Sequence, residues 1–129
     1  MASILIADDD PNILRALAFL MHAEGHDVRT VADGEAALAA VADEPPELLL
    51  LDVMMPKRNG YDVCRALREN PQYGRLRIVM LTAKGREADR QVGLELGVDA
   101  YLIKPFAIRD VVGCVNGVLE AGQHPDRRH

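Results

Sequence analysis

Carboxylates follow two of the apolar runs of this chain, at the point where each run ends. The acidic run Asp8-Asp9-Asp10 comes directly after residues 3–7, and Asp52 comes directly after residues 48–51. Carboxylates held close together repel one another and raise one another's pKa values unless a cation lies among them. Oxygen ligands in a small space suit Mg²⁺, which keeps several waters and takes one or two carboxylates. We therefore expect a magnesium site if these two run ends meet.

Two further runs end in a hydroxyl and an ammonium group. Thr82 follows residues 78–81, and Lys104 follows residues 100–103. A carboxylate acceptor, a divalent metal, a hydroxyl donor and a lysine are the groups needed to bind a phosphoryl group during its transfer. A carboxylate can itself be the nucleophile, which gives an acyl phosphate. The pattern as a whole predicts a phosphoryl-transfer site.

Each of these residues also has an ordinary structural interpretation. Acidic runs such as Asp8-Asp9-Asp10 usually cap helices, and Asp52 is compatible with the start of a turn. Thr82 is compatible with a helix cap, Lys104 with a solvated strand end, and Tyr101 with a core position. These separate explanations do not account for four run ends that carry the required groups in the required order.

The elements that must position these residues alternate along the chain. We expect strands at residues 3–7, 26–31, 48–51, 78–81 and 100–103, because each is a short apolar or alternating run. We expect helices at residues 11–24, 34–44, 59–70, 87–96 and 108–120, bounded by turn-forming residues. Apolar residues of the first helix, including Phe19, cover more than one stripe, so more than one of its faces should be buried.

Five strands alternating with five helices predict an α/β fold with a parallel sheet covered on both faces. We expect the flavodoxin-like, doubly wound strand order 2-1-3-4-5, in which the first and third strands are neighbours. Ligands of such sheets bind at the carboxyl ends of the strands, where the order reverses. This fold would bring Asp8 and Asp9 beside Asp52.

Length and composition indicate one soluble domain. A chain of 129 residues is long enough for an independent core, and we expect one domain at residues 1–120 with a flexible tail at 121–129. The net charge of −5 argues against direct nucleic-acid binding, which needs clustered Lys and Arg. No apolar run is long enough for a membrane span, and Cys64 and Cys114 form no C-x-x-C pair. We expect a reduced, cytoplasmic protein.

Four stretches together resemble the receiver domain of two-component response regulators, and the similarity covers essentially residues 4–119. These stretches are Ile4-Leu5-Ile6-Ala7-Asp8-Asp9-Asp10, Leu51-Asp52-Val53-Met54-Met55-Pro56, Met80-Leu81-Thr82-Ala83 and Tyr101-Leu102-Ile103-Lys104-Pro105-Phe106. The four are specific in combination, although none would be so alone. The strand order 2-1-3-4-5 is also that of the family, so the expected order is not a prediction independent of the resemblance.

The resemblance implies an acceptor and a metal site. Asp52 is similar to the family's phospho-acceptor. Asp9, Asp52 and the backbone carbonyl of Met54 are similar to its Mg²⁺ ligands, and Asp8 is implied as a ligand through water. Mg²⁺ is the expected cofactor.

The resemblance also implies a switch. Thr82 and Lys104 are similar to the groups that hold the phosphoryl oxygens, and Tyr101 to the side chain that turns inward when Thr82 moves. The Lys104–Pro105 bond is similar to one that is cis in the family, which an X-Pro bond permits. The expected output surface comprises residues 86–101 and the last helix.

The implied function is phosphorylation-dependent signalling. A histidine kinase or a histidine phosphotransfer protein would supply the phosphoryl group, and a downstream protein or a missing output domain would respond. The chain would be no enzyme beyond promoting its own phosphorylation and dephosphorylation. We expect a monomer or weak dimer, because Cys114, Asn116 and Glu120 stand where relatives carry basic residues that pair across a dimer.

Three alternatives stay open. A pseudo-receiver that serves as an interaction module without phosphorylation would lack some of the acids, Thr82 or Lys104, yet all are present. A phosphatase with an aspartyl nucleophile would carry Asp-x-Asp directly after its first strand. A flavin carrier of the same fold would need a hydroxyl- and glycine-rich first loop, and Asp8-Asp9-Asp10 would repel the flavin phosphate.

Overall fold

The structure, a computed structural model, describes residues 2–83 and 88–121, and within them it contains every expected strand and helix. The strands are β1 (Ser3–Ala7), β2 (Asp27–Val31), β3 (Leu48–Asp52), β4 (Arg77–Ala83) and β5 (Ala100–Lys104). The helices are α1 (Pro11–Ala23), α2 (Gly34–Asp43), α3 (Gly60–Arg68), α4 (Ala88–Leu96) and α5 (Ile108–Ala121), with a 3₁₀ turn, η1 (Pro71–Tyr73), before β4.

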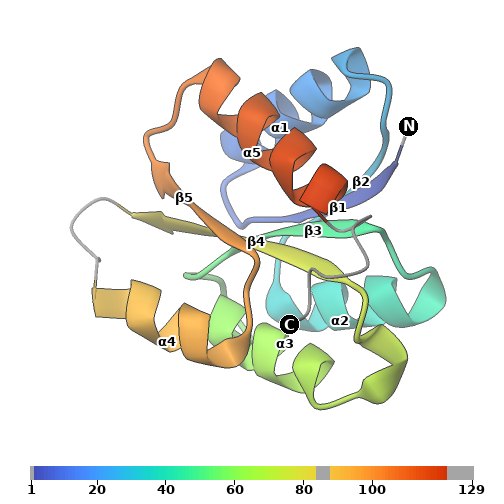
Figure 1. The fold of residues 1–129 in the computed structure, drawn as a ribbon, viewed down its shortest axis with the longest axis vertical. Coiled ribbons are helices and arrows are strands. Elements are labelled where there is room, and N and C mark those ends of the chain that lie inside the picture. The colour runs from blue at the N-terminus through green and yellow to red at the C-terminus, as the bar shows by residue number, and fades with distance from the viewer. Residues whose placement is uncertain (1, 84–87, 122–129) are drawn as a thin grey trace.

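The strands form one parallel sheet in the order β2-β1-β3-β4-β5, which confirms the flavodoxin-like order. Helices α1 and α5 cover one face of the sheet, and α2, α3 and α4 cover the other (Figure 1). The neighbours β1 and β3 run in register, with Ile4 opposite Leu48 and Ala7 opposite Leu51. The carboxyl ends of these two strands therefore reach the same level at one edge of the sheet.

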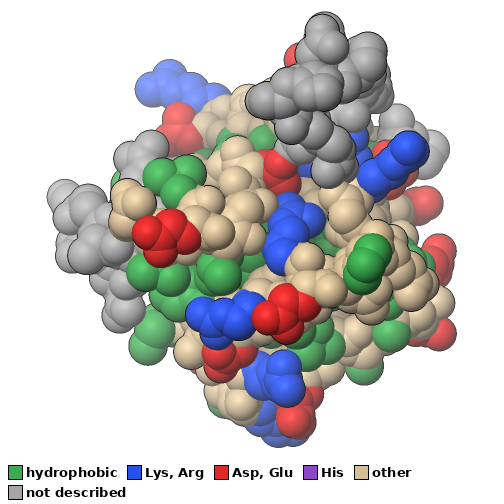
Figure 2. Space-filling model, turned by 60° about the horizontal axis from the view of Figure 1, so that its bottom comes forward, with side chains coloured by type: hydrophobic (Ala, Val, Ile, Leu, Met, Phe, Trp, Pro, Cys, Tyr) green, Lys and Arg blue, Asp and Glu red, His purple; other side chains and the backbone are tan. Residues whose placement is uncertain are grey.

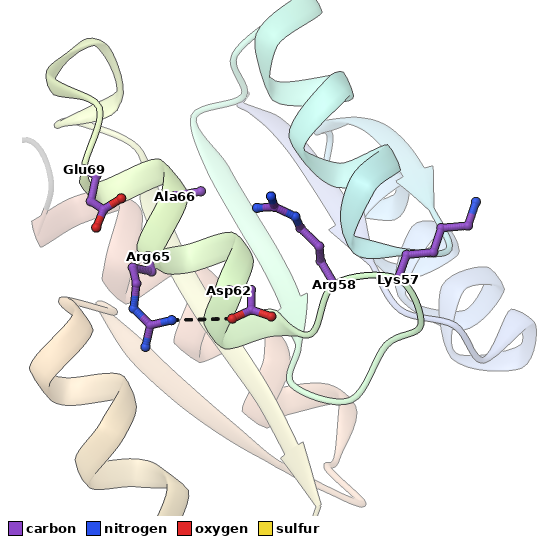
Figure 3. Close-up of a pocket in the computed structure, with 6 residues that line it drawn as sticks. All are labelled: Lys57, Arg58, Asp62, Arg65, Ala66 and Glu69. Atoms are coloured by element: carbon purple, nitrogen blue, oxygen red, sulfur yellow. Dashed lines mark hydrogen bonds and ion pairs between the residues drawn. The ribbon is translucent and has the colours of Figure 1, made fainter.

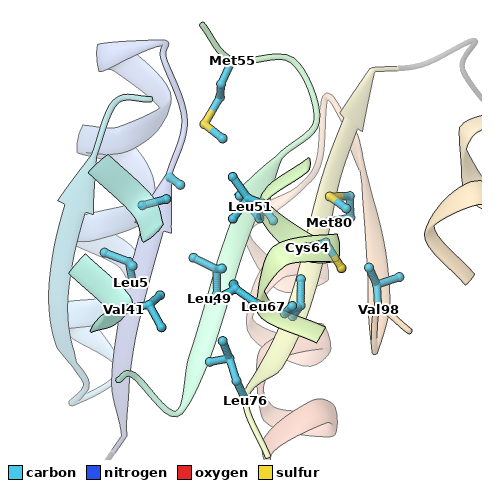
Figure 4. Packing of buried hydrophobic residues seen from close by; sticks show 14 of the residues in the cluster. Leu5, Val41, Leu49, Leu51, Met55, Cys64, Leu67, Leu76, Met80 and Val98 are labelled. Carbon is cyan, nitrogen blue, oxygen red and sulfur yellow. The ribbon is translucent and has the colours of Figure 1, made fainter. Parts of the chain in front are cut away.

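The central strand β3 anchors both layers, because every one of its residues is buried. Successive side chains of a strand point to opposite faces. Leu48 and Leu50 pack with α1 and α5, whereas Leu49 and Leu51 pack with α2, α3 and α4 (Figure 4). Burial of one leucine side chain stabilises a fold by roughly 1.5–3 kcal/mol. The run of leucines is thus the source of the rigid support for Asp52, which follows it.

Helix α1 differs from expectation in how much of it is buried. Leu17 and Met21 are buried against the sheet, but Phe19 is 77% exposed. The prediction that more than one face of α1 is buried is therefore wrong. The buried residues of α1 belong to the single core that it shares with the sheet and α5, and Phe19 lies away from that core.

Helix α5 continues through Ala121. Residues 122–129 of the expected tail lie outside the described residues, and so does Glu87, the expected first residue of the fourth helix. None of the described helices combines the length and the apolar character needed to span a bilayer. Among the described residues on the face seen in Figure 2, acidic and basic side chains are interspersed rather than gathered by sign.

A largely buried ion pair joins three segments at the amino edge of the sheet. Arg68, at the end of α3, contacts Asp99 with an Nη2–Oδ2 distance of 3.2 Å. The Arg68 guanidinium also donates to the carbonyls of Gly97 at 3.1 Å and Leu76 at 2.7 Å. Asp99 Oδ2 accepts a further hydrogen bond from the Ile78 N–H at 2.8 Å. These contacts tie α3 to the segments that precede β4 and β5.

Candidate phosphoryl-transfer site

The acid cluster, which we define as Asp8, Asp9 and Asp52, lies at the carboxyl edge of the sheet. Asp8 directly follows β1 and Asp52 ends β3, and the residues before them, Ala7 and Leu51, are register partners. One carboxylate oxygen from each of the three acids lies within 4.8 Å of the others. Asp8 and Asp52 are buried, and Asp9 is exposed. The sheet thus brings together the three carboxylates that the sequence singles out.

Lys104, the last residue of β5, reaches the acid cluster from two strands away. Its Nζ donates to Asp8 Oδ2 at 2.9 Å and to Asp52 Oδ1 at 3.2 Å. The side chains of Asp8 and Asp52 are 0% and 7% exposed, so both contacts are shielded from water. Within the described residues, Lys104 is the one cation that contacts these carboxylates.

Burial and mutual repulsion shift the pKa values at this site. Burial, and after it the charge of Asp8, raises the pKa of Asp52 from 3.8 to about 6, although Lys104 acts in the opposite direction. Burial by itself would lower the pKa of Lys104, but its contacts with Asp8 and Asp52 outweigh burial and raise that pKa. At neutral pH the site therefore holds an ammonium and a carboxylate that is costly to keep ionised.

The residues present fit a hard divalent cation. Among the described residues, the three carboxylates meet one ammonium group, so this set keeps an excess of negative charge. Carboxylate and carbonyl oxygens are the ligands that Mg²⁺ takes in proteins, usually with several waters retained. Asp9 is exposed, which leaves a side of the cluster accessible to solvent. The donor set thus agrees with the predicted magnesium site, and the identity of the ion stays a prediction.

The three residues of the acidic run Asp8-Asp9-Asp10 have two different roles, helix capping and membership of the acid cluster. Asp10 is the N-cap of α1, because its Oδ1 accepts a hydrogen bond from the Asn12 N–H at 2.9 Å. The Asp10 N–H in turn donates to Asp8 Oδ1 at 2.9 Å and fixes that carboxylate. The helix-capping interpretation is therefore right for Asp10, whereas Asp8 and Asp9 belong to the acid cluster.

Thr82 carries a buried hydroxyl that is ready to bind an acceptor. Asp52 is the register partner of Leu81, so Thr82 stands one residue further along the neighbouring strand. Its Oγ1 is buried and has no hydrogen-bond partner among the described residues. Leaving a buried polar group unsatisfied costs about 1–3 kcal/mol. An anion that entered this edge of the sheet would relieve that cost.

The remaining predicted residues lie around this centre. Tyr101 is half-buried and packs with the core beneath α2, α3 and α4. Met54 follows Asp52 by two residues and is 55% exposed, and the assignment of its backbone carbonyl to the metal stays a prediction. The Lys104–Pro105 peptide bond is cis.

Two glycines at the starts of α2 and α3, Gly34 and Gly60, approach the loop after Asp52 closely. A Cβ on Gly60 would lie 2.4 Å from the Asp52 carbonyl oxygen, and a Cβ on Gly34 would lie 2.1 Å from the Arg58 carbonyl oxygen. The Gly60 N–H donates to the Val53 carbonyl at 2.8 Å. Lys57, between them, adopts a φ of 69°, which is unusual for a residue other than glycine. The loop that carries Met54 is therefore tightly packed between the starts of α2 and α3.

A separate hollow of about 360 Å³ lies beside α3 and shares no residue with the acid cluster. Figure 3 shows its lining, in which Arg65 pairs with Asp62 at 3.4 Å. Lys57 is itself 3.7 Å from Asp33 of the α2 cap. The charges of this hollow are thus partly neutralised within the chain.

The chain is similar to known proteins over almost its whole length. Residues 4–116 match the family model of the response regulator receiver domain. The chain is 47% identical to the transcriptional regulatory protein CpxR of Escherichia coli (strain K12) over 119 residues, which are 92% of this chain and 50% of CpxR. It is 43% identical to the alkaline phosphatase synthesis transcriptional regulatory protein PhoP of Bacillus subtilis (strain 168) over 120 residues, 93% of this chain and 49% of PhoP.

A solved structure gives the same result for the fold. The chemotaxis response regulator CheY4 of Vibrio cholerae superposes with a TM-score of 0.86 at 30% identity, covering 92% of this chain and 98% of that one. The chain therefore matches 98% of that CheY4 chain, and it spans about half the length of the curated relatives CpxR and PhoP.

Proposed function

This chain belongs to the family of response regulator receiver domains of two-component systems, and from that premise we propose that it is a signalling switch phosphorylated on Asp52. The observation that carries the proposal is the buried Asp52 carboxylate, which lies among two other acids and within 3.2 Å of the Lys104 ammonium. Asp52 combines a raised pKa with an accessible edge of the sheet, a combination typical of functional carboxylates.

In the proposed reaction, a carboxylate oxygen of Asp52 attacks the phosphorus atom of a phosphohistidine and forms an acyl phosphate. The phosphorus–nitrogen bond breaks, its electron pair stays on the imidazole nitrogen, and that nitrogen takes up a proton. Asp52 must be ionised to attack, and with a pKa of about 6 the carboxylate predominates at pH 7 and above. The Lys104 ammonium and the Thr82 hydroxyl would then bind the phosphoryl oxygens.

We assign Asp8, Asp9, Asp52 and the Met54 carbonyl as the groups that would hold Mg²⁺. When bound, this ion would neutralise the charge that the carboxylates and the phosphoryl oxygens bring together. The chain's own contribution is to hold the carboxylates in register at two adjacent strand ends and to keep the Lys104 ammonium in contact with Asp8 and Asp52.

Intact-mass spectrometry tests the assignment of Asp52. Wild type treated with acetyl phosphate and MgCl₂ should gain the mass of one phosphoryl group, and Asp52→Asn should gain none. Asp10→Asn is the matched control, because asparagine caps helices as well as aspartate does and this change removes a neighbouring charge outside the acid cluster. An unmodified wild type would instead favour the pseudo-receiver, an interaction module without phosphorylation.

We propose that phosphorylation acts on the surface formed by α4, β5 and α5. Movement of Thr82 toward a phosphoryl group on Asp52 would change the packing of Tyr101, which lies in the half of the fold that includes α4. Amide hydrogen exchange compared with and without a phosphoryl mimic should show altered protection in these three elements. Unchanged protection there, with Asp52 occupied, would refute this part of the proposal.

The partners follow from the same proposal. The donor would be a histidine kinase or a histidine phosphotransfer protein, and the response would come from a downstream protein or from an output domain. CpxR and PhoP, which are named as transcriptional regulators, are about twice as long as the matching segment, so an attached output domain agrees with their lengths. The domain would act in the cytoplasm as a monomer or weak dimer, without catalysis beyond its own phosphorylation and dephosphorylation.

A further inference from the structure

Gly93, in the interior of α4, is buried directly against Tyr101 of β5. A Cβ built on Gly93 would lie 1.3 Å from the Tyr101 hydroxyl oxygen and 2.4 Å from its Cζ. Real Cβ atoms essentially never approach another heavy atom within 3.0 Å. The hydroxyl end of the Tyr101 ring therefore occupies the volume in which any other residue at position 93 would place its side chain.

The two interior glycines of α5 show that this is not a general property of helical glycines here. Glycine inside a helix lowers its stability relative to alanine. A Cβ on Gly113 or on Gly117 would meet nothing within 4 Å, so space gives no reason for glycine at either position. At Gly93, by contrast, the missing side chain is what allows Tyr101 to lie where it does.

Tyr101 also shares one face of the sheet with Thr82. The register of β4 and β5 pairs Met80 with Tyr101 and Thr82 with Ile103. Because residues two apart on a strand point to the same face, Thr82 and Tyr101 are diagonal neighbours on the face that α4 covers. Met80 and Tyr101 indeed lie in the same core. The ring thus belongs to the same sheet face as the Thr82 side chain, and its hydroxyl end lies against the backbone of α4 at Gly93.

We propose that Gly93 is the positioning residue for Tyr101: by lacking a Cβ it provides the seat of the Tyr101 ring against α4. A shift of α4 would then move the hydroxyl end of the Tyr101 ring, and a shift of Thr82 would act on the ring from the neighbouring strand. Resting on the proposed function, the same contact transmits phosphorylation of Asp52 to α4. A side chain at position 93 displaces the ring and breaks that transmission, and it leaves the acid cluster intact.

A thermal double-mutant cycle tests the seat, with Gly113→Ala as the matched control. Gly113→Ala should raise Tm by roughly 2–5 °C, the usual gain from alanine inside a helix. Gly93→Ala should lower Tm by roughly 3–10 °C, because the new methyl group overlaps the ring. In a Tyr101→Ala background, Gly93→Ala should raise Tm as Gly113→Ala does. An equal rise in the wild-type background, or an equal fall in the Tyr101→Ala background, would overturn the proposal.

Ring resonances of ¹³C-labelled tyrosine test the transmission. The Tyr101 signals are identified by their loss in Tyr101→Phe, and Tyr61 and Tyr73 serve as internal references. Wild-type Tyr101 signals should shift on treatment with acetyl phosphate and MgCl₂. In Gly93→Ala they should differ before treatment and move less than half as far, while intact mass shows equal phosphoryl uptake.

The outcomes separate this inference from the proposed function. Full-sized movement of the Tyr101 signals in phosphorylated Gly93→Ala would overturn the transmission through Gly93. Absence of phosphoryl uptake in wild type would overturn the proposed function and with it the transmission. The thermal cycle needs no phosphorylation, so it decides the role of Gly93 as the seat of Tyr101 in either case.

Discussion

Charged side chains gather at both ends of the parallel strands, at the amino edge and at the carboxyl edge of the sheet. The two groups differ in how far their charges are balanced. At the amino edge, the Arg68 guanidinium donates to Asp99 and to two carbonyls, and Asp99 also accepts the Ile78 N–H. At the carboxyl edge, Lys104 is shared between Asp8 and Asp52, and Asp9 adds a third carboxylate. The first group is a closed network of opposite charges, and the second, counted over residues 2–83 and 88–121, has more acids than cations.

This difference distinguishes an ion-pair network that is complete without a ligand from a cluster of acids that is suited to bind one. A buried ion pair with its remaining hydrogen bonds satisfied holds segments together and needs no ligand. A buried carboxylate whose pKa is raised to about 6 costs stability at neutral pH, and a bound cation would recover that cost. The Thr82 hydroxyl, which has no hydrogen-bond partner among the described residues, lies at the carboxyl edge as well, where parallel sheets bind ligands.

Breaking the closed network should have the largest effect on stability. Arg68→Ala leaves Asp99 largely buried without its cation, so we expect a loss of about 2–4 kcal/mol in the free energy of unfolding. Arg65→Ala in the same helix removes a solvent-exposed pair with Asp62 and should cost less than about 0.5 kcal/mol. Urea unfolding compares the two variants, and equal losses would refute the distinction between closed and exposed pairs.

Removing a charge from the acid cluster should raise the free energy of unfolding, whereas breaking the Arg68–Asp99 network should lower it. The folded-state pKa of Asp52, about 6, lies above its ordinary 3.8, so stability linked to its proton is present below pH 3.8 and is lost as pH rises through 6. Asp52→Asn should therefore match wild type at pH 4 and exceed it by about 1–3 kcal/mol at pH 8 without metal. A variant that is less stable than wild type at pH 8 contradicts the raised pKa.

Binding of Mg²⁺ at the acid cluster should raise the free energy of unfolding. Mg²⁺ at ten times its dissociation constant should stabilise wild type by about 1.4 kcal/mol, because it binds the folded acid cluster alone. Asp52→Asn should gain much less, and Arg65→Ala as much as wild type. Thermal unfolding with MgCl₂ and with a chelator measures these gains. Equal stabilisation of Asp52→Asn would place the bound ion elsewhere on the chain.

The smallest change in the free energy of unfolding is expected from substitution of Thr82. Thr82→Val replaces a buried group that makes no hydrogen bond in the described residues, so the free energy of unfolding should rise or stay within about 1 kcal/mol. Thr82→Ser keeps the hydroxyl and serves as the control. A loss well above that range in Thr82→Val, measured by urea unfolding, would mean that the hydroxyl has a partner in the folded protein.

The carboxyl edge was predictable because it depends on strand order and chain position. Strands that alternate with helices specify a parallel sheet, and the order 2-1-3-4-5 then places Asp8 beside Asp52 without knowledge of any side-chain contact. The apolar run Leu48–Leu51 was likewise predicted to be a strand, and its burial on both faces is typical of a central strand of a parallel sheet.

The amino edge was not predictable, because its partners are distant in sequence and have no repeated pattern. Arg68 and Asp99 are 31 residues apart, and each is of a type that is usually exposed. Likewise, neither composition nor spacing reveals that a Cβ at Gly34 or Gly60 would overlap the loop after Asp52. Such overlaps depend on distances of a few ångströms between elements, which only packed coordinates supply.

Helix faces were predicted with intermediate success. The apolar residues of α1 correctly indicated a helix that packs on the sheet, but hydrophobicity alone did not tell the buried Leu17 from the exposed Phe19. Which stripe is buried depends on how the helix is rotated against the sheet, and that rotation is fixed by contacts with other elements rather than by the helix sequence.

The central claim is that the unmet charge of the acid cluster lets Asp52 take up a phosphoryl group only when a divalent cation completes the site. The most direct measurement is phosphoryl uptake from acetyl phosphate, read by intact mass across a Mg²⁺ titration that begins in chelator. We predict no uptake in chelator, and uptake of one group that rises with Mg²⁺ and then saturates. Equal uptake in chelator, or none at saturating Mg²⁺, would contradict the account.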